Sequence, residues 1–143
     1  MSNVRGLNLP LLRRITNALS GRFFPNRSCE ITTYFVGPKK MASLNAKFLG
    51  HEGPTDVITF DYGHDGGEIF ICPDVAVAQA KEFGMTPQME LVRYLVHGLL
   101  HLKGYDDCRA SDHARMKKAE DKWVRWVAAE FRCDKVWSRK RAA

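Results

Sequence analysis

The stretch QMELVRYLVHGLLHLKG, from Gln88 to Gly104, predicts an apolar helix that carries two histidines. Thr86 and Pro87 stand just before it and suit a helix start, because a threonine hydroxyl accepts from free N–H groups and proline fits the first turn. Gly104 suits the end, since glycine takes the left-handed conformation at little cost. The sequence therefore predicts a well-bounded helix followed by a reversal of the chain.

His97 and His101 lie four residues apart in this helix, so they are about 40° apart around its axis and about 6 Å apart along it. Both imidazoles can therefore reach one ion. Asp107 follows the turn at Gly104 and can swing back as a third ligand. Two imidazoles and one carboxylate suit zinc and leave a position open for water, as a hydrolytic site requires. The pattern predicts that His97, His101 and Asp107 hold a metal-bound water as the catalytic group.

Other residues near the turn leave the third ligand open. Asp106, Cys108 and His113 are the alternatives, and His113 falls where the first turn of a final helix is expected. Two histidines at this spacing also arise by chance on a helix. Their neighbours are apolar, however, and a buried imidazole without a partner is unfavourable, which favours a metal site.

The position after the first histidine distinguishes this motif from that of zinc peptidases. HExxH peptidases use the glutamate beside the first histidine as the general base, and Gly98 stands at that position here. Glu90 lies on the same helix face but two turns away. A metallopeptidase remains an alternative that lacks its expected base.

Length and composition indicate one ordinary globular domain. The chain has 143 residues, of which 45% are apolar and 27% charged. We expect a single metallo-hydrolase-like domain over residues 1–137 and a basic, flexible tail over residues 138–143. No apolar run approaches the roughly 20 residues of a membrane span, and the N-terminus is too polar for a secretory signal. We therefore expect a cytoplasmic protein without a membrane partner.

The net charge of +6 and the pI of about 9.3 allow a polyanionic partner such as RNA, because Lys and Arg displace the counterions of phosphates. A basic protein without such a partner has the same composition. The four cysteines form no CxxC pair and are expected as reduced thiols.

The remaining elements alternate between helical and extended patterns. Helices are predicted over residues 10–21, 38–50, 74–84 and 112–131, and strands over residues 30–37, 55–62 and 68–72, with a glycine-rich turn at 63–67. The second helix is expected to place its apolar residues on one side: Met41, Leu44, Phe48 and Leu49. The mixture predicts an α+β fold, with a small mixed β-sheet covered by several helices.

Three motifs in order resemble one known family. HGLLHLKGYDD (residues 97–107) is similar to the H-G-x-L-H-L-x-G-Y-D-H signature of the bacterial YbeY family. LNAKFLGHEGPTDVITF (residues 44–60) resembles its L-N-x-x-Y-R-x-x-x-x-P-T-D-V-L-S-F segment, and GGEIFIC (residues 66–72) resembles its G-D-I-x-I strand. The likeness extends over more than half of the chain.

The resemblance implies a compact α+β domain, one zinc ion held by three side chains, and cleavage of single-stranded RNA. It also implies the small ribosomal subunit and the 3′ end of its 16S RNA as partners. His97 and His101 match the first two family ligands, whereas Asp107 stands where the family has a third histidine. A carboxylate still binds zinc but admits harder ions such as manganese more readily.

A second departure concerns a cation. The family segment carries an arginine associated with RNA, and Leu49 stands at that position. Leucine cannot pair with a phosphate. Lys47, close in sequence, and Arg93, one helical turn before His97, are the candidate substrate-binding cations, although either can be a solvated surface residue.

The predicted function is a metal-dependent, single-strand-specific endoribonuclease in rRNA processing, including 16S 3′-end maturation and ribosome quality control. The alternative is a ribosome-associated RNA-binding assembly factor whose metal is mainly structural. Leu49 and Asp107 favour the alternative, since each changes a feature tied to catalysis.

Overall fold

The computed structural model describes residues 5–25, 30–106 and 108–139. Its α-helices are α1 (Leu9–Phe23), α2 (Pro38–Leu44), α3 (Pro73–Phe83), α4 (Pro87–Lys103) and α5 (Ala110–Glu130). Its strands are β1 (Glu30–Phe35), β2 (Val57–Asp61) and β3 (Gly66–Ile71). Short turns of other helix types are η1 (Asn45–Leu49), η2 (Gly63–Asp65) and η3 (Cys133–Lys135). The predicted α+β class is confirmed.

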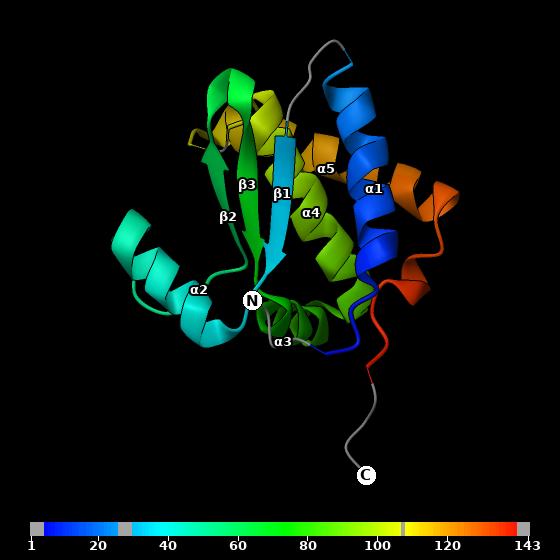
Figure 1. Ribbon diagram of the computed structural model, residues 1–143, viewed down its shortest axis with the longest axis horizontal. Coiled ribbons are helices and arrows are strands. Elements are labelled where there is room, and N and C mark those ends of the chain that lie inside the picture. The colour runs from blue at the N-terminus through cyan, green and yellow to red at the C-terminus, as the bar shows by residue number, and fades with distance from the viewer. Residues whose placement is uncertain (1–4, 26–29, 107, 140–143) are drawn as a thin grey trace.

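The three strands form one mixed sheet in the order β1-β3-β2 (Figure 1). β1 runs parallel to β3, and β2 runs antiparallel to it. The predicted pairing of the second and third strands is confirmed, with Thr59 opposite Ile69. β3 begins at Gly66, two residues earlier than predicted, because Gly66 and Gly67 already pair with neighbouring strands. β2 is therefore an edge strand joined to the central strand by a short turn.

α4 covers one face of the sheet and forms the centre of the main core (Figure 1). Leu95 and Leu99 of α4 are completely buried, as are Ile69 and Ile71 of β3. Burying a side chain of this size contributes roughly 1.5–3 kcal/mol. The Thr86 hydroxyl accepts from the backbone N–H of Met89 at 3.2 Å, as expected for a helix start. The helix predicted from its apolar pattern is thus the element on which the others pack.

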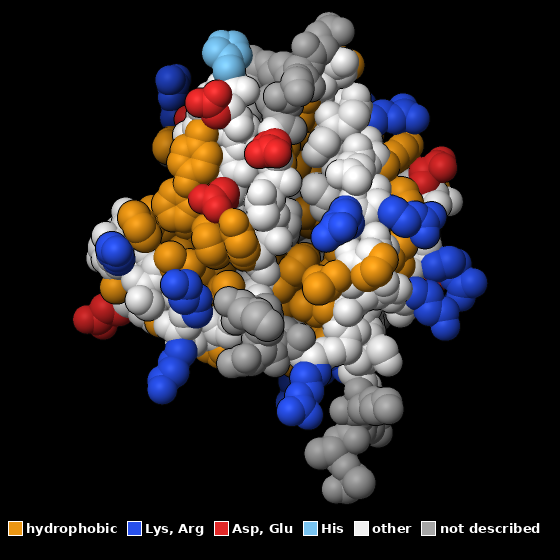
Figure 2. Space-filling view, viewed as in Figure 1, with side chains coloured by type: hydrophobic (Ala, Val, Ile, Leu, Met, Phe, Trp, Pro, Cys, Tyr) orange, Lys and Arg blue, Asp and Glu red, His pale blue; other side chains and the backbone are white. Residues whose placement is uncertain are grey.

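α2 covers only part of the opposite face. Beneath it lies a smaller cluster of buried residues: Val36, Met41, Leu44, Ile58 and Cys72. The helix was expected to place Met41, Leu44, Phe48 and Leu49 on one side. Met41 and Leu44 are buried, whereas Phe48 and Leu49 are 53% and 50% exposed. In η1 the hydrogen bond from Gly50 spans five residues instead of four, so the wider turn moves both side chains out of the buried row. Figure 2 shows hydrophobic side chains gathered over this side of the sheet.

The segment after α5 is packed onto the domain. Val136 and Trp137 are buried, and Trp137 Nε1 donates to the Arg5 carbonyl at 2.9 Å. The backbone N–H of Ser138 also donates to the Gly6 carbonyl at 2.9 Å. Residues 140–143 of the predicted tail lie outside the described residues. None of the helices in the described part of the chain has the length and apolarity that a membrane crossing requires.

Candidate metal centre

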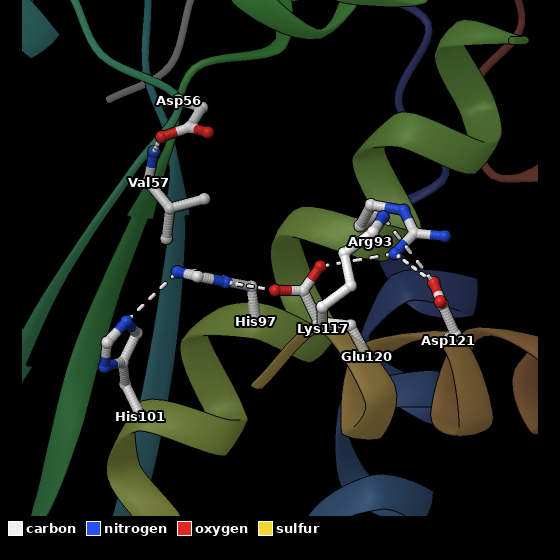
Figure 3. Close-up of polar contacts among 8 residues, drawn as sticks. All are labelled: Asp56, Val57, Arg93, His97, His101, Lys117, Glu120 and Asp121. Carbon is white, nitrogen blue, oxygen red and sulfur yellow. Dashed lines mark hydrogen bonds and ion pairs between the residues drawn. The ribbon is translucent and has the colours of Figure 1, made fainter. Parts of the chain in front are cut away.

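His97 and His101 project from the same side of α4 toward each other (Figure 3). Their Nε2 atoms are 3.0 Å apart, and the two rings lie at 75° to each other. Both side chains are partly buried where α4 packs against the sheet. The four-residue spacing therefore produces the convergence that the sequence predicts, and it brings the same ring nitrogen of each histidine to one point.

Glu120 of α5 fixes the orientation of the first histidine. Its Oε2 atom accepts a hydrogen bond from His97 Nδ1 at 2.6 Å (Figure 3). Because a carboxylate only accepts, Nδ1 carries the proton and Nε2 keeps its lone pair in the neutral imidazole. Carboxylates commonly hold metal-binding histidines in this way. Sequence reasoning missed Glu120, although an acidic residue four positions after buried Met116 interrupts the apolar side of α5.

Arg93 in turn holds Glu120. Its Nη1 donates to Glu120 Oε1 at 3.2 Å and to Asp121 Oδ1 at 3.0 Å. Burial acts to raise the pKa of the Glu120 carboxyl, but hydrogen bonds and charges from His97 and Arg93 outweigh it and lower that pKa. The structure thus gives Arg93 a defined role in orienting the histidine's partner, whereas its predicted contact with substrate stays a prediction.

Four residues were candidates for a third ligand: Asp106, Asp107, Cys108 and His113. Asp107, the predicted ligand, is outside the described residues. Asp106 accepts from the backbone N–H of Cys108 at 2.9 Å. His113 is exposed in the first turn of α5. Within residues 5–25, 30–106 and 108–139, no three His, Cys, Asp or Glu side chains are grouped to hold a metal.

The two histidines nevertheless fit a zinc ion. Two nitrogens on a tetrahedral zinc, each about 2.0–2.1 Å from it, are roughly 3.3 Å apart, close to the spacing of these Nε2 atoms. The proton on His97 Nδ1 leaves the correct nitrogen for coordination. A set of two imidazoles with a predicted carboxylate is a donor set that zinc accepts and manganese tolerates.

The remaining candidate residues lie apart from the histidines. Lys47 lines a groove with Phe60 and Phe70, on the face of the sheet opposite the one that α4 covers. Its Nζ lies 5.3 Å from the centre of the Phe48 ring. Leu49 is half exposed in η1. The structure therefore brings the two histidines together with Arg93, through Glu120, but not with Lys47.

Gly98 has a structural reason of its own. A Cβ atom at this position would lie 2.8 Å from Cγ2 of Ile69, closer than side-chain packing permits. Gly98 thus faces the sheet and lets α4 approach β3 closely. A glutamate here would be forced into the core, so the general base of an HExxH peptidase has no place at this site.

Comparison with known proteins identifies the family of the chain. The family profile described as "Endoribonuclease YbeY" matches residues 9–127. An Endoribonuclease YbeY from Chlorobium luteolum is 35% identical, over 80% of this chain and 84% of its own length. Another from Chlorobaculum tepidum is 39% identical, over 66% of this chain and 72% of its own.

The fold is shared as well. The solution structure of TM1509 from Thermotoga maritima superposes with a TM-score of 0.67 and 27% identity, covering 93% of this chain and 90% of that one. A small mixed sheet with helices packed on it, a histidine pair on the buried helix and the family profile define one class of protein. The chain belongs to the YbeY family of endoribonucleases.

Proposed function

We propose that this protein is a metal-dependent endoribonuclease for single-stranded RNA, with His97, His101 and Asp107 as its metal ligands. The observation that supports this most directly is the pair of Nε2 atoms 3.0 Å apart, one of them on a histidine oriented by Glu120. Chance histidines on a helix do not require a buried carboxylate behind them. The family membership makes RNA phosphodiesters the substrate class.

Each described residue has a separate task in this proposal. Glu120 accepts the Nδ1 proton of His97 and thereby fixes its tautomer, while Arg93 keeps Glu120 charged and in place. The two histidines would hold the ion where α4 packs against the sheet (Figure 3). Zinc, or manganese in its place, would supply the Lewis acidity that polarises a phosphoryl oxygen and acidifies water.

We further propose that the substrate is ribosomal RNA in the cytoplasm, with the 3′ end of 16S RNA on the small ribosomal subunit as the processed site and ribosome quality control as the setting. The basic charge of the chain suits such a partner, because RNA binding is strengthened by release of phosphate counterions. The choice of 16S RNA rests on the sequence resemblance, and it names one substrate for the endoribonuclease activity of the family.

Metal content and RNA cleavage together test the proposed site. His97→Ala, His101→Ala and Asp107→Ala are each expected to lose bound zinc, as measured by elemental analysis after dialysis, and to lose cleavage of a single-stranded RNA. His64→Ala changes an exposed histidine in η2 and serves as the matched control. Full zinc content in Asp107→Ala would reject that ligand and direct attention to Cys108 or His113.

The second candidate function is an RNA-binding assembly factor with a structural metal. Leu49 favours it, because this half-exposed side chain presents no charge where the family resemblance predicts an arginine. Chelation separates the two functions. Loss of cleavage with retained fold and RNA affinity supports the enzyme, whereas unfolding on chelation, together with no cleavage by the zinc-loaded protein, supports the assembly factor.

A further inference from the structure

We propose that the open face of the sheet is a platform on which unpaired RNA bases stack. The platform, here called the aromatic face, consists of five rings: Tyr34, Phe48, Phe60, Tyr62 and Phe70. This inference rests on the proposed RNA substrate and adds a binding subsite to it. It concerns the face opposite the histidines, which the metal chemistry does not use.

Four of the five rings of the aromatic face form a continuous row. Phe48 meets Phe60 edge to face at 5.2 Å between ring centres, and Phe60 meets Phe70 in the same way at 5.7 Å. Phe70 then stacks on Tyr34 at 4.7 Å, with 16° between the ring planes. The row crosses the sheet from η1 to β1, because Tyr34 and Phe70 are partners in the strand register.

Three of the five rings are exposed to a degree that folding does not explain, whereas Phe60 and Phe70 are partly buried between them and the core. Phe48 is 53% exposed, Tyr62 is 52% exposed and Tyr34 is 39% exposed. Together with α2 the face encloses a groove of about 530 Å³, lined by Phe48, Phe60, Tyr62 and Phe70 among others. A contiguous exposed apolar surface of this kind marks a binding site more often than a structural accident.

The charges around the groove favour a nucleic acid over a purely apolar ligand. Lys40 and Lys47 line the groove, and Figure 2 shows Lys and Arg side chains beside the hydrophobic area. Lys47 Nζ lies 5.3 Å from the centre of the Phe48 ring, so one base and its phosphate can meet a ring and a cation at neighbouring points. Aromatic rings beside cations are the usual way in which proteins hold single strands.

Glu68 adds a polar group in the middle of the aromatic face. It is the register partner of Phe60 on β2, and its Oε1 accepts from the Tyr62 hydroxyl at 2.6 Å. A carboxylate at this position repels a phosphate but accepts the N–H groups on a base edge. The arrangement therefore places bases over the sheet and phosphates toward the lysines.

The edge strand β2 separates the aromatic face from the side of the sheet on which α4 carries the histidines. Val57 of β2 packs with the core on the α4 side, whereas Phe60 of the same strand packs on the other side. Because β2 is the edge of the sheet, a single strand can pass around it without crossing the protein. A bound RNA would then have bases on one face while its backbone reaches the metal ligands beside the other.

Binding of a labelled oligonucleotide tests the platform separately from cleavage. A short single-stranded 2′-O-methyl RNA resists cleavage while retaining bases and phosphates, and fluorescence anisotropy reports its affinity. Phe48→Ala is expected to weaken binding on the order of ten-fold, since stacking on one ring contributes this much. Phe83→Ala removes an aromatic side chain that is 67% exposed at the end of α3 and is the matched control.

The phosphate contact has its own pair of variants. Lys47→Ala is expected to weaken binding and to reduce its salt dependence, because one fewer counterion is released. Lys81→Ala removes an exposed lysine of α3 and is expected to change neither. A strand with abasic sites keeps its phosphates but lacks bases. If the wild type binds this strand more weakly than the intact one, and Phe48→Ala binds both equally, the bases stack on this ring.

The outcomes separate the platform from the nuclease. Equal affinity of Phe48→Ala and Phe83→Ala overturns the platform, while cleavage of RNA by the wild type still supports the proposed function. Absence of both binding and cleavage in the zinc-loaded wild type rejects the proposed function itself. If Phe48→Ala keeps its affinity for the oligonucleotide but no longer binds small ribosomal subunits, the face belongs to a protein partner and the platform is overturned.

Discussion

The two faces of the sheet contrast in what covers them. On one face α4 packs against the sheet with most of its residues buried, and the same helix carries the two partly buried histidines. On the other face α2 is short, and aromatic rings remain in contact with solvent. The difference indicates a division of roles, in which the covered side provides stability and orients the proposed metal ligands while the open face is available for binding.

The largest expected difference is in stability. Leu95→Ala on the covered face removes a completely buried side chain and is expected to lower the free energy of unfolding by about 2–5 kcal/mol. Leu49→Ala on the open side removes a half-exposed side chain and is expected to change it by less than about 0.5 kcal/mol. Urea denaturation measures both, and equal losses would contradict the assignment of stability to the covered face.

Two helical glycines sharpen the comparison. Gly98→Ala places a Cβ atom 2.8 Å from Ile69 and is expected to cost about 1–3 kcal/mol of stability. Gly21→Ala lies in α1 with nothing within 4 Å of the new atom, so it is expected to stabilise by about 0.5–1 kcal/mol. Thermal unfolding of the two variants should therefore shift in opposite directions. A stabilised Gly98→Ala would mean that α4 does not rest on β3 through this glycine.

Glu120 tests whether the packing of α5 on α4 orients the proposed metal ligands. Glu120→Gln keeps the shape of the side chain but removes the negative charge of the group that accepts from His97 Nδ1, so zinc affinity is expected to fall about 10- to 100-fold. Competition with a zinc-binding dye measures this change. Glu130→Gln, an exposed position at the end of α5, is the control and should bind zinc like the wild type. Normal zinc affinity in Glu120→Gln would reduce the carboxylate to a structural ion pair.

The fold was largely predictable because local signals and packing agree. The helix of residues 88–104 has an apolar pattern, a capping threonine and a terminal glycine, and the structure ends it within one residue of the expected bounds. The second helix was predicted less well. Its apolar residues suit a buried row, but the five-residue hydrogen bond at Gly50 turns Phe48 outward, and no sequence period indicates such a turn.

The site was predictable only as far as local spacing reaches. His97 and His101 share one helix, so their convergence follows from helical geometry. Glu120 lies 23 residues after His97 on another helix, and its contact depends on how α4 and α5 pack. Arg93 was also only partly predictable. Its position one turn before His97 indicated a cation near the proposed metal site, but the ion pairs of Arg93 with Glu120 and Asp121 depend on helix packing.

The smallest expected effect concerns Leu49, which stands where the resembling family segment carries an arginine. Leu49→Arg adds a guanidinium beside Phe48, next to the aromatic face, where it can pair with a phosphate of a bound strand. RNA cleavage is expected to rise a few-fold, since one exposed cation contributes on the order of 1 kcal/mol or less. Met85→Arg adds the same charge at an exposed apolar residue between α3 and α4 and should leave cleavage unchanged.

The two variants separate a local effect from a general one. An equal rise in both would mean that net charge alone limits RNA binding, because any added cation strengthens attraction to phosphates. A rise in Leu49→Arg alone that disappears at high salt would place the substrate backbone beside η1. No rise in either would mean that Lys40 and Lys47 already supply the positive charge at the groove, since both line it beside Phe48. In that case Lys47→Ala should lower cleavage in the wild type, and Leu49→Arg should restore it.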